Sequence, residues 1–283
     1  MIKIILIIMA VFILYCMIET ARELRDFRLT KYRICSPKLN GIRGTKKIIF
    51  LSDLHNRMYG KENERLLESI KNQHPDLILI GGDMLVRKDG NSYDRTVRFL
   101  EKLPAICPVY CANGNHEQKL KELPDKYEQS YEGYKKALTA CGIHMLENAS
   151  ETVRLDEAPV RISGLEIPLR AYARFGKKDL PLKEITDRIG EHGEEYQILL
   201  AHHPGYIQEY LEYGADMILS GHYHGGCDAA SGDRRGDFTG FYTISKILRR
   251  NIQGRSTDGG RKPRTGNTFC AGKIVELAGT DRS

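Results

Sequence analysis

The sequence lacks the cysteine pairs that mark a disulfide framework or a zinc knuckle. Its seven cysteines are odd in number, and no two of them form a Cys-x-x-Cys pair. We therefore expect reduced, mostly buried thiols. The chain has 283 residues, which is long enough to bury a hydrophobic core without disulfides or a structural metal.

Signatures of nucleotide and nucleic-acid binding are also missing. No Gly-x-x-x-x-Gly-Lys-Ser/Thr pattern occurs, so "GGRKPR" near the C-terminus is not a phosphate-binding loop. The formal net charge is +6, but residues 227–283 hold 11 Lys and Arg against 6 Asp and Glu and carry most of that charge. Because the rest of the chain is close to neutral, we expect no nucleic-acid partner.

The N-terminus is strongly apolar. Residues 4–18, "IILIIMAVFILYCMI", are fifteen apolar residues without a break. That length is adequate for a span if flanking residues snorkel or the bilayer thins. A cleaved signal peptide is the alternative, but no small-residue cleavage site follows the run. We predict a single-pass membrane anchor over residues 1–21, and the basic residues after it place the globular part in the cytoplasm.

Apolar runs of strand length begin at Lys46, after a polar stalk and a first strand over residues 22–45. They occur in "KIIFLSDLH", "DLILIGGD", "PVYCANGNHE", "YQILLAHHP" and "ADMILSGHYH". Between the first few, "ENERLLESIKNQ" and "YDRTVRFLEKL" have apolar residues at helical spacing. Strands that alternate with helices predict an α/β fold, and "VRISGLEIP" indicates a second or mixed sheet.

Each of these runs stops at Asp, His or Asn, and in three of the five a Gly stands beside that residue. Ligands bind beyond the carboxyl ends of the strands in α/β sheets, so these ends indicate a metal site. Asp53 and His55 are two residues apart, which on an extended chain sends both side chains to one side. His222 and His224 repeat that spacing, and the glycines before Asp83 let the backbone approach closely.

Two more loops complete the set of donors. "GNHE" offers the amide oxygen of Asn115 and the ring of His116, and "AHHP" offers either His202 or His203. Histidine and carboxylate together suit zinc, manganese or iron. With one histidine taken from "AHHP" and His116 set aside, two Asp, one Asn and four His are too many for one tetrahedral site. They suit two metal ions that share a carboxylate.

These five motifs, in this order, resemble the calcineurin-like metallophosphoesterases, and in particular small bacterial membrane-anchored members of phosphodiesterase type. The resemblance covers residues 46–226 and implies a four-layer α-β-β-α sandwich of two mixed sheets. It also implies two divalent metal ions (Mn, Zn or Fe) and assigns their ligands. These are Asp53, His55 and His224 for one ion, Asn115, His202 and His222 for the other, and Asp83 as the bridge.

The activity that the resemblance implies is hydrolysis of a phosphodiester or phosphomonoester by attack of a metal-bridging hydroxide. His116 is similar to the family's non-ligand histidine, which faces the phosphate and protonates the leaving group. His203 is then a pocket residue, because the family's ligand lies two residues before the proline. The anchor suits a lipid-linked substrate.

Residues 227–283 depart from the family's pattern. "CDAASGDRRGDFTGF" stands where the family continues with apolar sheet. One permitted set of codons for it, read one base later, encodes the family-like AMRLPVIGGVISPD. We predict that the chain is read out of frame from about Cys227, and a basic tail without regular structure is the alternative.

Both readings of the tail leave segments such as "KIVELAG" without a partner surface. The second hypothesis for function is therefore an inactive or unstable metal-binding product that lacks the C-terminal strands of the fold.

Overall fold

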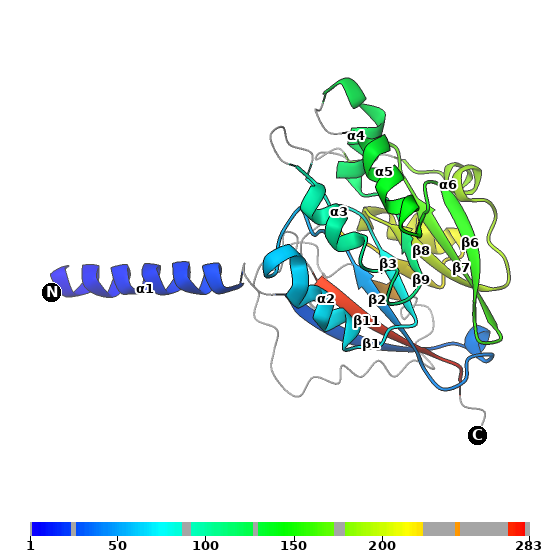
Figure 1. Cartoon of the computed structure of the whole chain (residues 1–283), viewed down its shortest axis with the longest axis horizontal. Helices are drawn as coiled ribbons and strands as arrows, with labels where there is room; N and C mark the ends of the chain where they lie inside the picture. Colours follow the sequence, from blue (N-terminus) through cyan, green and yellow to red (C-terminus); the bar gives the residue numbers. More distant parts are fainter. Residues whose placement is uncertain are drawn as a thin grey trace.

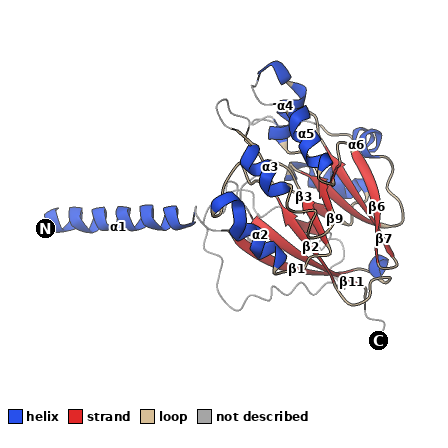
Figure 2. Ribbon diagram, viewed as in Figure 1, coloured by secondary structure: helices blue, strands red, loops and turns tan. Residues whose placement is uncertain are grey.

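The computed structural model describes residues 2–23, 27–86, 92–126, 130–172, 179–222, 241–243 and 271–280. Two β-sheets face each other in the body of the protein, and helices cover their outer faces (Figures 1 and 2). Both sheets contain parallel and antiparallel neighbours, so the prediction of an α/β fold with two mixed sheets is confirmed.

The larger sheet has six strands in the order β1-β11-β2-β3-β4-β5. Strands β2 to β5 run parallel to one another, whereas β11 is antiparallel to β2 and parallel to β1. The bounds are β1 Arg28–Cys35, β2 Lys46–Leu51, β3 Leu77–Ile80, β4 Val109–Cys111, β5 Ile143–Met145 and β11 Ala271–Ala278.

The smaller sheet has five strands in the order β10-β9-β8-β7-β6. Its three middle strands are parallel, and an antiparallel strand lies at each edge. The bounds are β6 Ala149–Leu155, β7 Ala158–Leu165, β8 Tyr196–Ala201, β9 Met217–Leu219 and β10 Phe241–Thr243. All five apolar runs that the sequence predicts as strands are therefore strands of the two sheets.

The helices form where apolar residues recur every three or four positions. In α2, for example, Leu66 and Ile70 are buried four residues apart. The Ser130 hydroxyl accepts a hydrogen bond from the Gly133 amide and so caps α5. The helices are α1 Ile2–Glu23, α2 Glu64–Lys71, α3 Asp94–Leu100, α4 Asn115–Glu122, α5 Tyr131–Ala140, α6 Leu182–Ile189 and α7 Ile207–Tyr213.

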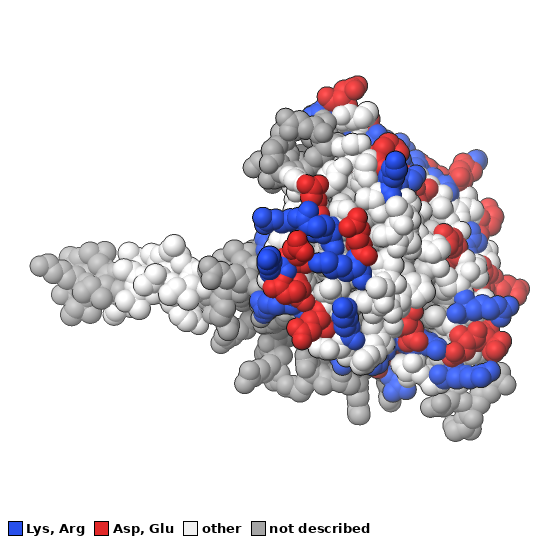
Figure 3. Space-filling view, in the orientation of Figure 1, with Lys and Arg blue, Asp and Glu red and all other residues white. Residues whose placement is uncertain are grey.

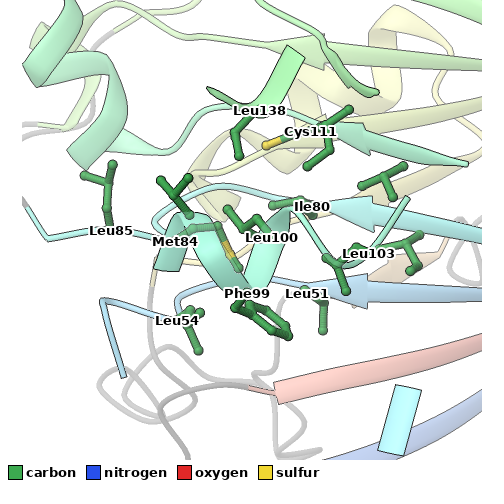
Figure 4. Packing of buried hydrophobic residues seen from close by; sticks show 14 of the residues in the cluster. Leu51, Leu54, Ile80, Met84, Leu85, Phe99, Leu100, Leu103, Cys111 and Leu138 are labelled. Carbon is green, nitrogen blue, oxygen red and sulfur yellow. The ribbon is translucent and has the colours of Figure 1, made fainter. Parts of the chain in front are cut away.

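Three hydrophobic clusters separate four layers. One lies between the larger sheet and α2 to α5, where Phe99 and Leu138 pack against strand residues such as Ile80 (Figure 4). A second joins the two sheets, for example through Phe50 and Leu200. The third lies between the smaller sheet and helices α6 and α7. Strands between two apolar layers must be apolar on both faces, which explains their unbroken apolar runs.

Strand β11 corrects the expectation that "KIVELAG" has no partner surface. It lies between β1 and β2 in the larger sheet, and Ile274, Val275 and Leu277 are all fully buried. Ile274 faces the helices, whereas Val275 and Leu277 face the second sheet. The sequence shows no alternation here because both faces of the strand are buried.

The rest of the C-terminal region is described only at β10, which pairs with β9. Residues 223–240 and 244–270 lie outside the described residues, so the predicted change of frame near Cys227 stays a prediction there.

Helix α1 covers the apolar N-terminal run and extends away from the two sheets (Figure 1). In the part of the chain that the structure describes, no helix is long and apolar enough to cross a membrane. The anchor predicted over residues 1–21 is therefore not supported, and neither is the placement of the body that depended on it.

Acidic and basic side chains are interleaved on the face shown in Figure 3. The Glu62 carboxylate, for example, lies 3.1 Å from both Arg98 and Lys102. Exposed pairs of this kind contribute little to stability, which therefore rests on the three hydrophobic clusters.

The position of β11 predicts that Ile274→Ala destabilises the protein. The substitution leaves a cavity between the larger sheet and its helices and costs about 2–5 kcal/mol of unfolding free energy. Urea denaturation checks this, with exposed Thr30→Ala on the neighbouring strand as the control. An Ile274→Ala protein as stable as the control would show that β11 is not part of the core.

Candidate metal centre

The predicted ligands follow five parallel strands, in loops or, for Asn115, at the start of α4. Asp53 and His55 follow β2, Asp83 follows β3, and Asn115 and His116 follow β4 in the larger sheet. In the smaller sheet His202 follows β8 and His222 follows β9. Both sheets thus present polar side chains at the carboxyl ends of their parallel strands.

Two groups of potential ligands share Asp83. His55, Asp83 and His116 form one group, and Asp83, His202 and His222 form the other. Within each group the ligand atoms all lie within 4.8 Å of one another. His224, the remaining predicted ligand, lies outside the described residues.

The Asp83 carboxylate is buried among imidazoles. Its Oδ2 lies 3.1 Å from His202 Nε2 and 3.9 Å from His55 Nε2. His116 Nε2 lies 4.0 Å from the same oxygen. Burial alone would raise the pKa of Asp83, but these histidines hold it well below its usual range. The carboxylate is therefore ionised, as a ligand of cations must be.

His202 presents one specific nitrogen to Asp83. Its Nδ1 lies 2.7 Å from the Gly81 carbonyl oxygen, which can only accept, so Nδ1 carries a proton and Nε2 faces the site. Burial lowers the pKa of His202, but Asp83 and Asp53 outweigh it and raise the pKa to about 10.

Two buried acceptor atoms in the centre also fit a metal ion. Among the described residues, Asn115 Oδ1 and His202 Nε2 make no hydrogen bond, although His202 Nε2 faces the Asp83 carboxylate at 3.1 Å. Buried polar atoms are normally satisfied, so each unpaired one needs an explanation. A cation coordinated by both atoms supplies it, and nitrogen with carboxylate oxygen suits zinc, manganese or iron.

Asp53 is fixed by hydrogen bonds from two sides. Its Oδ2 accepts from the Ser52 hydroxyl at 2.7 Å, and its Oδ1 accepts from the His222 amide at 2.9 Å. The same Oδ1 lies 3.8 Å from His55 Nε2 and 3.7 Å from His202 Nε2. Asp53 thus links the β2 loop to a ligand of the other sheet.

The extended-chain argument for Asp53 and His55 is wrong, although the two side chains do converge. Both residues have left-handed backbone, with φ of 57° and 50°, and Asp83 has φ of 52°. The cause is pairing between loops, since the Asp53 amide donates to Gly82 and the His55 amide donates to Asp83, each at 3.0 Å. Left-handed backbone in residues other than glycine is strained and gathers at functional sites.

Glycines make room for these carboxylates. Gly82 has φ of 91°, and a Cβ atom there would collide with the Gly114 backbone. A Cβ on Gly114 would strike Asp83, and one on Gly221 would strike Asp53. The prediction that glycine permits close approach before Asp83 is therefore confirmed at Gly82.

Glu117 directly follows His116, and the structure gives its carboxylate definite contacts. Its buried carboxylate accepts backbone hydrogen bonds from Asp83 and Met84 at 2.8 Å, from Gly114 at 3.0 Å and from Leu85 at 3.2 Å. Burial, with Asp83 nearby, raises the pKa of Glu117 to about 7. Sequence offered no signal for these contacts beyond adjacency to His116.

His203 differs from His202 in its partners. Its Nδ1 accepts from the Gly205 amide at 2.9 Å, and its ring lies 4.6 Å from that of His222. Burial, with His202 beside it, lowers the pKa of His203 to about 4, so the ring is neutral at pH 7. Tyr172, which the sequence analysis missed, packs edge-on against both His203 and His222.

A buried centre of histidine, aspartate and asparagine side chains between two mixed sheets defines a metal-binding α/β protein. The sequence model of the calcineurin-like phosphoesterases matches residues 46–226. The chain belongs to this family and is a metal-dependent phosphoesterase.

Two sequence relatives agree with this assignment. Over 210 residues the chain is 27% identical to YkoQ, an uncharacterized metallophosphoesterase of Bacillus subtilis strain 168, with 72% of this chain and 70% of YkoQ covered. Over 203 residues it is 26% identical to the phosphodiesterase YaeI of Escherichia coli K12, with 71% and 67% covered. Among solved structures, the phosphopantetheinyl hydrolase PptH of Mycobacterium tuberculosis is similar with a TM-score of 0.43 and 16% identity, over 77% of this chain and 99% of that one.

Removing the Glu117 carboxylate should weaken metal binding. In Glu117→Gln an amide NH₂ replaces one acceptor oxygen and faces backbone N–H donors, so the Asp83 loop loses its support. We expect metal affinity to fall by about 10–100-fold, as for other residues that hold ligands in place. Calorimetric titration with Mn²⁺ measures this, and Glu122→Gln on the same helix is the control. Equal metal affinities for the two variants would show that the contact between Glu117 and the Asp83 loop does not support metal binding.

Proposed function

We propose that the protein hydrolyses a phosphate ester, by preference a phosphodiester, at a centre of two divalent metal ions. One observation carries this proposal. Oδ2 of the buried Asp83 faces His202 Nε2 at 3.1 Å on one side and His55 Nε2 at 3.9 Å on the other. A carboxylate shared by two ligand groups is the arrangement that two-metal phosphoesterases need.

The proposed ligand sets share Asp83, as the two groups do, but the first set has Asp53 and His224 in place of His116, and the second set adds Asn115. The first ion takes Asp53, His55 and His224, and the second takes Asn115, His202 and His222, with Asp83 bridging. The unpaired Asn115 Oδ1 and His202 Nε2 support the second set in particular. The histidine-rich donor set favours manganese, zinc or iron over calcium or magnesium.

The bound ions would supply Lewis-acid charge and lower the pKa of water at the site toward neutrality. The remaining work falls to the chain's own side chains. The Asn115 amide orients a phosphoryl oxygen and stabilises the charge that develops on it. The His116 ring donates a proton to the leaving oxygen. Its side chain is 20% exposed, against 2% for Asp83, so a substrate can reach it.

The class of substrate is confined to phosphate esters. YaeI is named a phosphodiesterase, which favours a diester for this chain as well. The lipid-linked substrate depended on the membrane anchor, and the proposal does not include it. The alternative of an inactive product depended on missing C-terminal strands, and β11 is present in the sheet.

Asp83→Asn should abolish most hydrolysis and reduce bound metal. The substitution keeps the side chain's shape but removes the negative charge that both cations share. Hydrolysis of bis(p-nitrophenyl) phosphate with Mn²⁺, together with elemental analysis of the protein, tests this. Asp187→Asn, which alters an exposed ion pair with Lys183, is the control. Full turnover with two bound metals in Asp83→Asn would refute the site assignment.

His116→Ala separates a proton donor from a ligand. We expect the metal content to stay unchanged and the rate to fall by roughly 10²–10⁴-fold, the usual contribution of a general acid. Exposed His144→Ala is the matched control. A loss of metal together with rate would instead make His116 a ligand, which its distance from Asp83 also permits.

A further inference from the structure

A buried polar network lies beside the metal centre and uses none of its ligands. Its central residue is Glu166, which directly follows β7 and is only 4% exposed. Oε1 of Glu166 accepts from Asn113 Nδ2 at 2.7 Å, and Oε2 accepts from Lys121 Nζ at 2.8 Å. Asn148 adds two hydrogen bonds. Its Nδ2 donates to Glu166 Oε2 at 3.4 Å, and its Oδ1 accepts from the Glu166 backbone amide at 2.9 Å.

These contacts connect the two sheets. Asn113 follows β4 of the larger sheet, whereas Glu166 follows β7 of the smaller one. The network extends to Glu147, which lies 2.7 Å from both Lys121 and Lys135. Two largely buried carboxylates thus face two partly exposed ammonium groups, so the negative charge is balanced within the network.

The network contacts α4 near both of its ends and in its middle. Asn113 lies two residues before this helix begins, and Lys121 is in its last turn. Between them, Gln118 Nε2 donates to the Ile167 carbonyl at 2.8 Å. Three points on and beside α4 are therefore attached to residues 166 and 167, and the helix carries Asn115 at its N-terminal end.

We propose that Glu166 is a positioning residue that sets the distance between Asn115 and the histidines of the second sheet. The inference rests on the proposed two-metal centre. The second ion takes ligands from both sheets, namely Asn115 and Asp83 from the larger and His202 and His222 from the smaller. The geometry of this second site depends on the position of α4 relative to the smaller sheet, and the contacts of Glu166 fix that position.

The first ion also takes one ligand from the smaller sheet, His224, but it does not use Asn115, the ligand that α4 carries. Asp53 and His55 lie on the β2 loop, which is tied to the β3 loop by backbone hydrogen bonds and to His222 through the Asp53 carboxylate. None of these contacts passes through Glu166 or Asn113. Loss of the Glu166 contact should therefore lower the affinity for the second ion and leave the affinity for the first unchanged.

The test is a titration of the full chain with Mn²⁺, followed by calorimetry. The unsubstituted protein should bind two equivalents, and Glu166→Gln should weaken one step by about 10–100-fold and spare the other. Asn113→Ala, which cuts the same contact from the other side without a change of charge, should do the same. The double variant should be no worse than either single variant, since both remove one interaction. Excess Mn²⁺ should restore the rate.

Glu147→Gln is the matched control. It removes the same charge from the same network but touches no residue next to a ligand, so both steps should persist. The proposal is overturned if Glu166→Gln leaves both steps unchanged, or if it weakens both steps equally while urea denaturation shows a matching loss of stability.

A failure of the two-metal centre would look different. If the unsubstituted protein binds a single equivalent, the dinuclear proposal is wrong. The role of Glu166 is then decided on that one affinity. It is supported if Glu166→Gln and Asn113→Ala weaken it and Glu147→Gln does not, and it is overturned otherwise.

Discussion

The contact between the Asp83 carboxylate and the imidazoles around it is the interaction on which the site depends. Those imidazoles come from loops of both sheets, so the two sheets must end at one point and stay at a fixed separation. The cluster of apolar side chains between the sheets supplies that separation. Local contacts then set the finer geometry, because Glu117 holds the Asp83 loop and the Gly81 carbonyl orients His202.

Much of the fold and of the candidate site could be predicted, because the same apolar runs indicate both the strands and the positions of the candidate ligands. Each apolar run reports a buried strand, and the polar residue that ends it reports a position at the sheet's edge. Asp53, Asp83, Asn115 and His222 could all be placed in this way. The preference for His202 over His203 rests on the family's pattern, and the contacts of the two rings fit it. His202 Nδ1 is held by Gly81, whereas His203 Nδ1 is occupied by the Gly205 amide.

What could not be predicted depends on contacts between residues far apart in sequence. The left-handed backbone at Asp53 and His55 results from pairing with the β3 loop, about 30 residues away, so an argument from local extended geometry reached a correct neighbour for a wrong reason. The prediction for strand β11 was wrong for a related reason. Its place between β1 and β2 buries both faces, which removes the alternation by which an isolated strand is recognised.

The strained loops and the network around Glu166 are two parts of one requirement. Left-handed backbone at Asp53, His55 and Asp83 costs on the order of 1–3 kcal/mol for each residue, and it persists only where surrounding contacts determine it. Those contacts are hydrogen bonds within the chain. The Glu117 carboxylate accepts from the Asp83 amide, and the Ser52 hydroxyl donates to the Asp53 carboxylate. The chain therefore fixes its ligands before a cation arrives, and free energy of metal binding is not consumed in ordering them. A site preorganised in this way tolerates little movement of either sheet, and that is why a buried, charge-balanced contact between the sheets belongs beside it.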